Sequence, residues 1–408
     1  MQESRLKLPR TMAYVLAGGR VGELSVLTLL RPKAAVPFGG NYRIIDFALS
    51  NLTEAGVPRI GIVPQYQPAS LIDHIGAGQS WDLMSPGRGT KILPPFVGPE
   101  TSHWYRGNAD AVRQNLDFIR DHDPELVLVL SGDHVYHMDY RPLIRFHLER
   151  GADATVVLRA MGDEKDSRFG YGVLGGDGRL TDYREKPEVA PSDLASLTIY
   201  VFRRSVLEEV LLSSRQEDLE FGRHVVPSML GSYRIFGWVF DGYWGYCRTP
   251  ASYFQSNMDI LQGVVDLEAW GIRTNVYDQG LARKPPARIE TGSRIRGCLF
   301  SDGCVLAGTV ENSILGPGVR VEKGAIVSDS LLFHDTVIEA GAEVHGAILD
   351  KRVRVGRGSR VGAPLETGRA SEGDLTLLGK GVRVAAGDAV ARGEAVATPE
   401  TRGGRVRI

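Results

Sequence analysis

The clearest candidate for chemistry in this sequence is a phosphate-binding turn near its N-terminus. Gly18 and Gly19 follow a short apolar run at residues 12–16. Two adjacent glycines let backbone N–H groups approach a phosphate chain without a Cβ clash. Lys33 lies downstream in a segment stiffened by prolines, where one lysine can direct a point charge at a phosphate. Each signal is weak alone, but together they predict a site for a phosphate chain.

The elements that must position this turn alternate between strands and helices over the first 260 or so residues. Short apolar runs predict strands, and amphipathic stretches predict helices; the strands are expected at residues 12–16, 59–64, 126–130 and 154–158, and the helices at 44–55 and 109–120. This alternation predicts an α/β fold with a mostly parallel, Rossmann-like sheet. Ligands of such sheets bind at the carboxyl ends of the strands. The Gly18–Gly19 turn and the Gly132–Asp133 turn both follow strands, so we expect them to meet at one site.

A different pattern begins near residue 274, where helical periodicity ends. A motif of Ile or Val, two residues, Gly and a small residue recurs, and its glycines Gly324, Gly341 and Gly358 are spaced by 17 residues. This spacing is close to one coil of a triangular β-helix. The alternative is a coincidental glycine-rich β-region. Because a solenoid leaves open ends, this part of the chain is expected to serve assembly.

Composition narrows the class of protein. The net charge of the 408 residues is -1, so no basic field argues for nucleic acid. The sequence contains no apolar run near the roughly 20 residues that span a membrane, and the N-terminal residues lack the apolar region of a signal peptide. Three cysteines are too few and too odd in number for a disulfide framework. We therefore expect a cytoplasmic protein that binds neither nucleic acid nor membrane.

Seven motifs occur in a characteristic order: LAGGR, RPKAAVPFGG, YRIIDFALSN, WYRGNADAV, LVLVLSGDHVYHMDY, EKP and LASLTIYVF. Together they resemble the ADP-glucose pyrophosphorylase, or glucose-1-phosphate adenylyltransferase, family over nearly the whole chain. The resemblance implies a sugar-nucleotide nucleotidyltransferase domain at residues 1–265, a linker at 266–285, a left-handed β-helix at 286–397 and a tail at 398–408. The implied reaction joins ATP and glucose 1-phosphate to give ADP-glucose and pyrophosphate, for glycogen or another α-glucan. The implied cofactor is Mg²⁺, and the implied assembly is a homotetramer or a hetero-oligomer with a paralogue.

The resemblance also assigns roles to individual residues. The expected nucleotide-binding residues are Leu16, Ala17, Gly18, Gly19, Arg20, Gln65, Gly107 and Asp110, with Gln65 at the adenine. The expected sugar-side residues are Tyr105, Gly170, Glu185, Lys186 and Ser196. Asp133 corresponds to the metal-binding aspartate, and Lys33, Asp133 and Lys186 form the expected catalytic set. Transfer of this kind depends on positioning and charge neutralisation, and it needs no covalent nucleophile.

The sequence departs from the family pattern at catalytic and regulatory positions. Glu23 stands where the family has an arginine that faces the triphosphate, and Tyr246 stands where it has an aspartate that helps to hold the metal. A carboxylate about 4 Å from a phosphate charge costs on the order of 4 kcal/mol at an effective dielectric near 20. Asn41 replaces an effector-binding lysine, and Phe96 and Val97 replace a pair of glutamines, so the usual effector response is in doubt.

Two main hypotheses follow from these departures. In the first, the chain is an active adenylyltransferase in which Arg20 or another cation replaces the missing arginine. In the second, it is a catalytically weak regulatory paralogue that binds sugar phosphate or nucleotide. A third reading is an enzyme that uses another nucleoside triphosphate or sugar. Because Lys33, Asp133, Glu185 and Lys186 all remain, the first is favoured.

Overall fold

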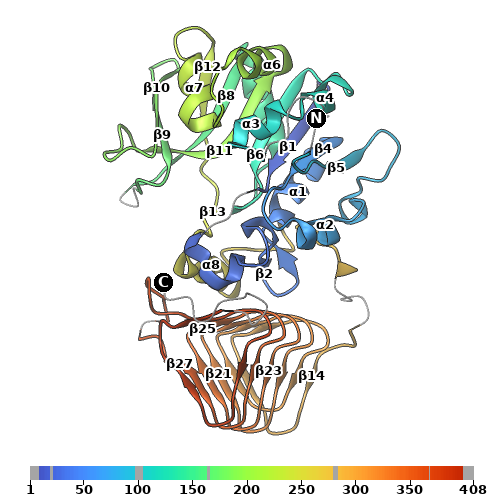
Figure 1. Cartoon of the computed structure of the whole chain (residues 1–408), viewed down its shortest axis with the longest axis vertical. Coiled ribbons are helices and arrows are strands. Elements are labelled where there is room, and N and C mark those ends of the chain that lie inside the picture. Colours follow the sequence, from blue (N-terminus) through green and yellow to red (C-terminus); the bar gives the residue numbers. More distant parts are fainter. Residues whose placement is uncertain are drawn as a thin grey trace, which may run out of the picture.

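A computed structural model describes residues 9–18, 22–96, 104–162, 166–278, 284–366 and 368–397. An α/β part is followed by a solenoid of short parallel strands, and the two parts are stacked along the long axis of the molecule (Figure 1). The predicted order of architectures is therefore confirmed. None of the helices in the described part of the chain is long and apolar enough to cross a membrane.

A nine-stranded sheet forms the centre of the α/β part, with the strand order β10-β9-β11-β6-β1-β4-β5; β8 also pairs with β11, and β12 pairs with β8. Its strands are β1 (Thr11–Leu16), β4 (Arg59–Val63), β5 (Gly89–Ile92), β6 (Leu126–Ser131), β8 (Ala154–Ala160), β9 (Gly170–Leu174), β10 (Leu180–Glu185), β11 (Leu194–Arg203) and β12 (Ile235–Val239). β6, β1, β4 and β5 run parallel to one another. β11 pairs antiparallel with both β6 and β8. The parallel half places the carboxyl ends of β1 and β6 next to each other, as predicted.

Helices cover both faces of the sheet because successive residues of a strand point to opposite faces. Ala13 and Val15 of β1 pack in a cluster with α1 (Ile45–Glu54), α2 (Ala69–Ile75) and α5 (Tyr140–Glu149). Met12 and Tyr14 pack in a second cluster with α3 (Asn108–Arg113), α4 (Leu116–Arg120), α6 (Arg204–Ser213) and α7 (Val226–Met229). β1 is thus buried on both sides, which explains its continuous apolar sequence.

The predicted helix at residues 109–120 is instead two short helices, α3 and α4, separated at Asn115. The Asn115 side chain donates a hydrogen bond to the backbone oxygen of Ala111 at 2.8 Å and another to the Tyr105 hydroxyl at 2.8 Å. An asparagine that bonds to nearby backbone in this way competes with helix propagation. The apolar period of the sequence crosses the break without a signal, so periodicity alone predicted one helix.

The solenoid consists of three six-stranded parallel sheets, and each coil contributes one strand to each sheet. The first sheet contains β14 (Arg288–Ile289), β17 (Val305–Leu306), β20 (Arg320–Val321), β23 (Val337–Ile338), β26 (Arg354–Val355) and β29 (Arg383–Val384). The second contains β15 (Arg294–Arg296), β18 (Thr309–Glu311), β21 (Ile326–Ser328), β24 (Glu343–His345), β27 (Arg360–Gly362) and β30 (Ala389–Val390). The third contains β16 (Leu299–Phe300), β19 (Ile314–Leu315), β22 (Leu331–Leu332), β25 (Ala347–Leu349), β28 (Thr376–Leu378) and β31 (Ala395–Val396).

The predicted repeat produces the inner ladder of this left-handed β-helix. Val321, Ile338 and Val355 are paired in register and are all buried. The coil formed by β26, β27 and β28 is longer than those before it, because an insertion lies between β27 and β28. The regular coils therefore have the length that the sequence repeat predicts, and the irregular coil is lengthened by an insertion.

A continuous apolar interface joins the two parts. It includes α8 (Pro250–Leu261), β2 (Pro37–Phe38) and η1 (Gly22–Thr28), two 3-10 turns with a kink at Ser25; β2 and α8 lie between the sheet and the solenoid in Figure 1. From η1, Leu24, Val26 and Leu27 belong to the same buried cluster as Leu365, Leu375 and Leu377 of the last coils. η1 contacts β28 and β31 directly. The segment that carries Glu23 therefore rests on the end of the solenoid.

Four further short elements belong to the α/β part of the chain. They are η2 (Lys33–Ala35), β3 (Tyr42–Arg43), β7 (Val135–Tyr136) and β13 (Trp244–Gly245). β13 pairs antiparallel with β7, so residues near 246 lie beside residues near 134. This pairing brings a segment from beyond the sheet back to the carboxyl end of β6.

Candidate active site

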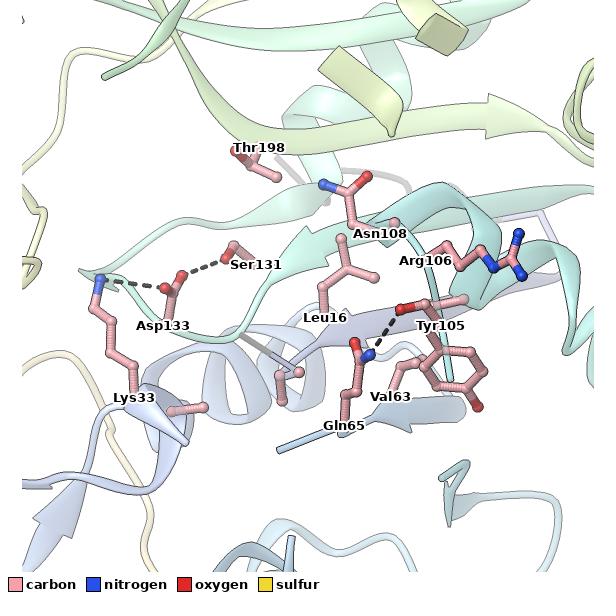
Figure 2. Close-up of a pocket in the computed structure, with 15 residues that line it drawn as sticks. Leu16, Lys33, Val63, Gln65, Tyr105, Arg106, Asn108, Ser131, Asp133 and Thr198 are labelled. Carbon is pink, nitrogen blue, oxygen red and sulfur yellow. Dashed lines mark hydrogen bonds and ion pairs between the residues drawn. The ribbon is translucent and has the colours of Figure 1, made fainter. Parts of the chain in front are cut away.

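A cleft of about 290 Å³ opens at the carboxyl ends of β1, β4 and β6. It is lined by Leu16, Ala17, Gly18, Lys33, Ala34, Val63, Gln65, Tyr105, Arg106, Gly107, Asn108, Ala111, Ser131, Asp133 and Thr198. Figure 2 shows Lys33 and Asp133 at one end and Gln65 and Tyr105 at the other. The first end therefore carries a lysine and an aspartate, whereas Arg106 also lies at the second end, beside Tyr105.

An ion pair between Lys33 and Asp133 marks the charged end. The Lys33 ammonium is 3.2 Å from an Asp133 carboxylate oxygen, and the Lys33 side chain is only 2% exposed. Ser131 donates a short hydrogen bond to the same carboxylate. Burial acts to raise the pKa of Asp133, but Lys33, His134 and Ser131 outweigh it and hold this pKa well below its usual range. Asp133 is therefore an anion at any physiological pH.

Aromatic rings enclose this end of the cleft. The Lys33 ammonium lies 4.8 Å from the centre of the Tyr246 ring, a distance at which a ring face attracts a cation. His134 contacts the rings of both Trp244 and Tyr246. Burial lowers the pKa of His134 to about 4, so its imidazole is neutral. Tyr246, which replaces the expected aspartate, thus supplies a ring face in place of a carboxylate.

The opposite end of the cleft contains Gln65, Tyr105 and Arg106. The Gln65 amide donates a hydrogen bond to the backbone oxygen of Tyr105 at 2.7 Å. A Cβ added to Gly18 would lie 3.1 Å from the Gln65 Cβ, so the glycine permits this close approach. The Tyr105 hydroxyl donates to the backbone oxygen of Leu93 at 2.9 Å and points into the core. Tyr105 therefore lines the cleft without offering its hydroxyl to it.

Gly107 and Asp110 have different positions at the start of α3. Gly107 lines the cleft, and a Cβ there would meet the backbone oxygen of Leu219 at 2.2 Å. Asp110 is buried outside the cleft lining, and its carboxylate accepts hydrogen bonds from the Arg106 backbone at 3.0 Å and from Arg113 at 2.7 Å. Asp110 thus holds the segment that lines the cleft, and its predicted contact with nucleotide stays a prediction.

The sugar-side residues gather in a neighbouring region. Gly170 and Glu185 are paired in register between β9 and β10, and Ser196 is buried on β11, two residues before Thr198 of the cleft. Lys186 is exposed. None of these four residues lines the cleft around Lys33 and Asp133. The structure therefore brings two members of the predicted catalytic set together and leaves Lys186 apart.

One aromatic side chain connects this region to the charged end of the cleft. The Lys186 backbone N–H donates to the backbone oxygen of Phe169 at 3.0 Å, and the Phe169 ring centre lies 4.5 Å from that of Tyr246. Burial, with Glu220 nearby, raises the pKa of Glu185, although Lys186 opposes the shift. Lys186 is thus connected to Tyr246 through Phe169.

Gly19 and Arg20 lie outside the described residues, so their predicted roles stay predictions. The donor set for the expected metal is small. Within the part of the chain that the structure describes, no three His, Cys, Asp or Glu side chains are grouped to hold a metal ion. Mg²⁺ is commonly bound through one or two carboxylates together with substrate phosphates. Asp133 fits such a shared site, and the donor set does not fit a metal held by protein alone.

Arg248, which sequence reasoning missed, joins Glu23 to Tyr246 in the structure. The Arg248 guanidinium lies 2.8 Å from a Glu23 carboxylate oxygen and donates to the Tyr246 hydroxyl at 2.8 Å. The carboxylate that was expected to face the triphosphate alone is therefore paired. Ser131, Asn108 and Thr198 were also missed. The signal available for Arg248 was a cation two residues after Tyr246, within the segment already singled out.

Comparison with known proteins agrees with this geometry. Residues 12–263 match the family model described as nucleotidyl transferase, and residues 285–385 match one described as GlmU-like, C-terminal hexapeptide. The chain is 36% identical over 391 residues to a glucose-1-phosphate adenylyltransferase of Desulfitobacterium hafniense (strain Y51), covering 94% of this chain and 97% of the relative. It is 42% identical over 324 residues to one of Thermotoga maritima, covering 78% and 76%. It is 37% identical over 355 residues to one of Acetivibrio thermocellus, covering 86% and 83%. The chain therefore belongs to the glucose-1-phosphate adenylyltransferase family of nucleotidyltransferases, as its motifs predicted.

Proposed function

We propose that this protein transfers the adenylyl group of ATP to glucose 1-phosphate, giving ADP-glucose and pyrophosphate. The observation that carries the proposal is the Lys33–Asp133 pair at the carboxyl ends of the parallel strands, beside a cleft that begins at Gly18. The names of the relatives support the same reaction. A phosphate oxygen of glucose 1-phosphate attacks the α-phosphorus, and the bond from that phosphorus to the β-phosphate oxygen breaks.

Lys33 and Asp133 have complementary parts in this reaction. Lys33 is buried and positioned by both Asp133 and the Tyr246 ring, so its charge reaches a phosphate without reorganisation. Such preorganised charges contribute most where negative charge develops in a transition state. Asp133 stays ionised because Lys33, His134 and Ser131 keep its pKa low. Ser131 orients the carboxylate toward the cleft.

Asp133 is the residue that would hold Mg²⁺, together with phosphate oxygens of the substrates. A divalent ion held there would supply positive charge to the phosphate groups of the substrates. We place glucose 1-phosphate beside Glu185, Lys186 and Ser196, because these residues lie next to Thr198 and Phe169 at the charged end of the cleft. We place adenine near Gln65, at the opposite end.

The experiment is release of pyrophosphate from purified protein given ATP, glucose 1-phosphate and Mg²⁺. We expect Asp133→Asn to lower the rate by at least about 100-fold, as for removal of a preorganised charge. Asp177→Asn is the matched control, because Asp177 lies exposed in the turn between β9 and β10, and it should keep the native rate. No release by the native protein would refute the enzyme proposal and favour the regulatory paralogue. Replacing ATP with UTP, dTTP, CTP or GTP tests the base.

The cellular setting of the enzyme is also a proposal. The three cysteines are free thiols, which suits the reducing cytoplasm, and ADP-glucose would supply glycogen or another α-glucan there. An oligomer, in the first place a homotetramer, follows from the resemblance. Light scattering of the purified protein measures its mass and decides between a monomer and a tetramer.

A further inference from the structure

Arg248 and Glu23 form a charge pair at the phosphate end of the cleft that the roles assigned so far leave unexplained. Glu23 is the second residue of η1, the pair of kinked turns that begins at Gly22. Arg248 comes from the segment after β13. The guanidinium uses both Nε and one terminal nitrogen on Glu23 and the other terminal nitrogen on the Tyr246 hydroxyl. Two distant segments are thus connected across one aromatic ring.

Arg248 is close to the residues that hold phosphate in the proposed reaction. Its guanidinium carbon lies 6.0 Å from the centre of the Tyr246 ring, and the Lys33 ammonium lies 4.8 Å from the same centre. The two cations therefore contact one ring. The Arg248 side chain is 26% exposed and that of Glu23 is 40% exposed, so both are accessible to a solute.

The backbone that carries Arg248 is well positioned. Thr249 is the N-cap of α8: its hydroxyl accepts from the Ser252 backbone at 3.2 Å, and the Ser252 hydroxyl accepts from the Thr249 backbone at 3.0 Å. A guanidinium has five N–H donors, and three of them are used by Glu23 and Tyr246. The two others remain for a ligand without any change of backbone.

A second arginine, Arg168, lies close enough to influence both Glu23 and Tyr246. It pairs with Asp166 at 2.7 Å. Burial acts to raise the pKa of Glu23, but its own backbone N–H and Arg248 outweigh burial, and this pKa is lowered. Glu23 is therefore an anion, and it competes with any phosphate for the same guanidinium.

We propose that Arg248 binds the distal phosphates of the nucleotide, the part that leaves as pyrophosphate, and that Glu23 holds its guanidinium in place when no nucleotide is bound. The inference rests on the proposed reaction, in which the electron pair of the broken phosphorus–oxygen bond passes to the β-phosphate. Arginine matches a phosphate with paired N–H donors better than lysine does. Arg248 thereby supplies the cation that is absent at position 23.

Binding of magnesium pyrophosphate, measured by calorimetry, tests this assignment without turnover. Arg248→Gln should weaken binding by about 10- to 100-fold, the range for loss of hydrogen bonds to a charged group. Glu23→Gln should strengthen it, because the competing carboxylate is removed. Arg248→Lys should fall between Arg248→Gln and the native protein. Affinity for glucose 1-phosphate should stay unchanged in all three.

The decisive result is that Arg248→Gln and Glu23→Gln change the affinity for pyrophosphate in opposite directions. If the pair only ties two segments together, Arg248→Gln and Glu23→Gln break the same contact and weaken binding alike, which would overturn the proposal. Arg354→Gln is the matched control, because it breaks an exposed pair with Glu339 in the solenoid; it should change nothing. Thermal unfolding of each variant shows that the fold is kept, as expected for an exposed ion pair.

The two proposals fail in different ways. If the native protein releases pyrophosphate but Arg248→Gln binds it normally, the role of Arg248 is refuted and the reaction stands. If the native protein binds pyrophosphate with these mutant effects but releases none from ATP, Arg248 is a phosphate ligand of a binding protein and the reaction is refuted. If it neither binds nor releases pyrophosphate, both are refuted.

Discussion

His74 is a buried histidine enclosed by two carboxylates. Its Nε2 lies 2.6 Å from Asp46 and its Nδ1 lies 2.9 Å from Asp278, and Arg43 binds both of these aspartates. Burial acts to lower the pKa of His74, but the two carboxylates outweigh it and raise this pKa above 6.5. The imidazole therefore joins α2 to α1 and to the segment that leads into the solenoid.

The raised pKa makes stability depend on pH with a definite sign. A group whose pKa is higher in the folded state contributes stability that is complete below its unfolded pKa, about 6.5, and is lost as pH rises through the folded value. We expect the thermal midpoint of the native protein to fall more between pH 6 and pH 9 than that of His74→Gln. Equal slopes for the two proteins would contradict it.

For individual residues, the sequence predicted those contacts that follow from the order of strands in the sheet. Gly18 and Asp133 each follow a strand, and adjacent parallel strands place their ends side by side, so one site was expected. The contact of Arg248 with Glu23 was not predictable in this way, because it depends on how the segment after β13 folds back. The same limit applies to Tyr105, whose hydroxyl direction is set by Leu93 and Asn115.

Among the elements, α3 depends on one close contact for its position. The backbone N–H groups of Ala109 and Asp110 both donate to the Leu219 oxygen at 3.0 Å. Gly107 lies against the same carbonyl, with no room for a Cβ. The start of α3 is thus held by the chain before α7, and this contact sets the wall of the cleft that contains Tyr105 and Asn108.

Gly107→Ala should therefore disturb both the fold and nucleotide binding. The added methyl group forces the carbonyl away, and overpacking of this kind costs about 1–3 kcal/mol. We expect a lower thermal midpoint together with a higher KM for ATP. Gly176→Ala is the control, because a Cβ there has no neighbour within 4 Å. A Gly107→Ala protein that resembles Gly176→Ala in both measurements would show that this contact is dispensable.

The elements themselves were largely readable from periodicity. The predicted strands and the helix at residues 44–55 agree with β1, β4, β6, β8 and α1 within a residue or two, because each is an uninterrupted apolar pattern. Antiparallel β11 was not predicted as a strand, and the break at Asn115 was not seen. Both depend on partners far along the chain, which a local pattern does not contain.

For the whole molecule, one buried ion pair bridges the catalytic segment and the solenoid. Arg31, two residues before Lys33, lies 2.6 Å from Asp350, which follows β25. The two side chains are 5% and 1% exposed. Removing one partner of such a pair leaves an uncompensated charge in the interior, which costs about 3–5 kcal/mol. The pair therefore couples the position of Lys33 to the solenoid.

Arg31→Met should lower the thermal midpoint markedly and reduce the rate of pyrophosphate release. Adding Asp350→Leu should recover most of the stability, because it removes the stranded charge. Arg354→Gln, which breaks an exposed pair, should cost less than about 1 kcal/mol. A double variant no more stable than Arg31→Met would show that the interface needs the pair itself and not only neutrality.

The apolar contact between η1 and the last coils has a genetic consequence. A nonsense mutation shortly after codon 362 would spare every side chain that lines the cleft and all of β14 to β27. It would nevertheless remove Leu365, Leu375 and Leu377, which pack in the same buried cluster as Leu24 and Leu27. An open reading frame shortened there would encode each recognisable motif of the first 260 residues. It would still lack the packing contacts that keep Glu23 opposite Arg248.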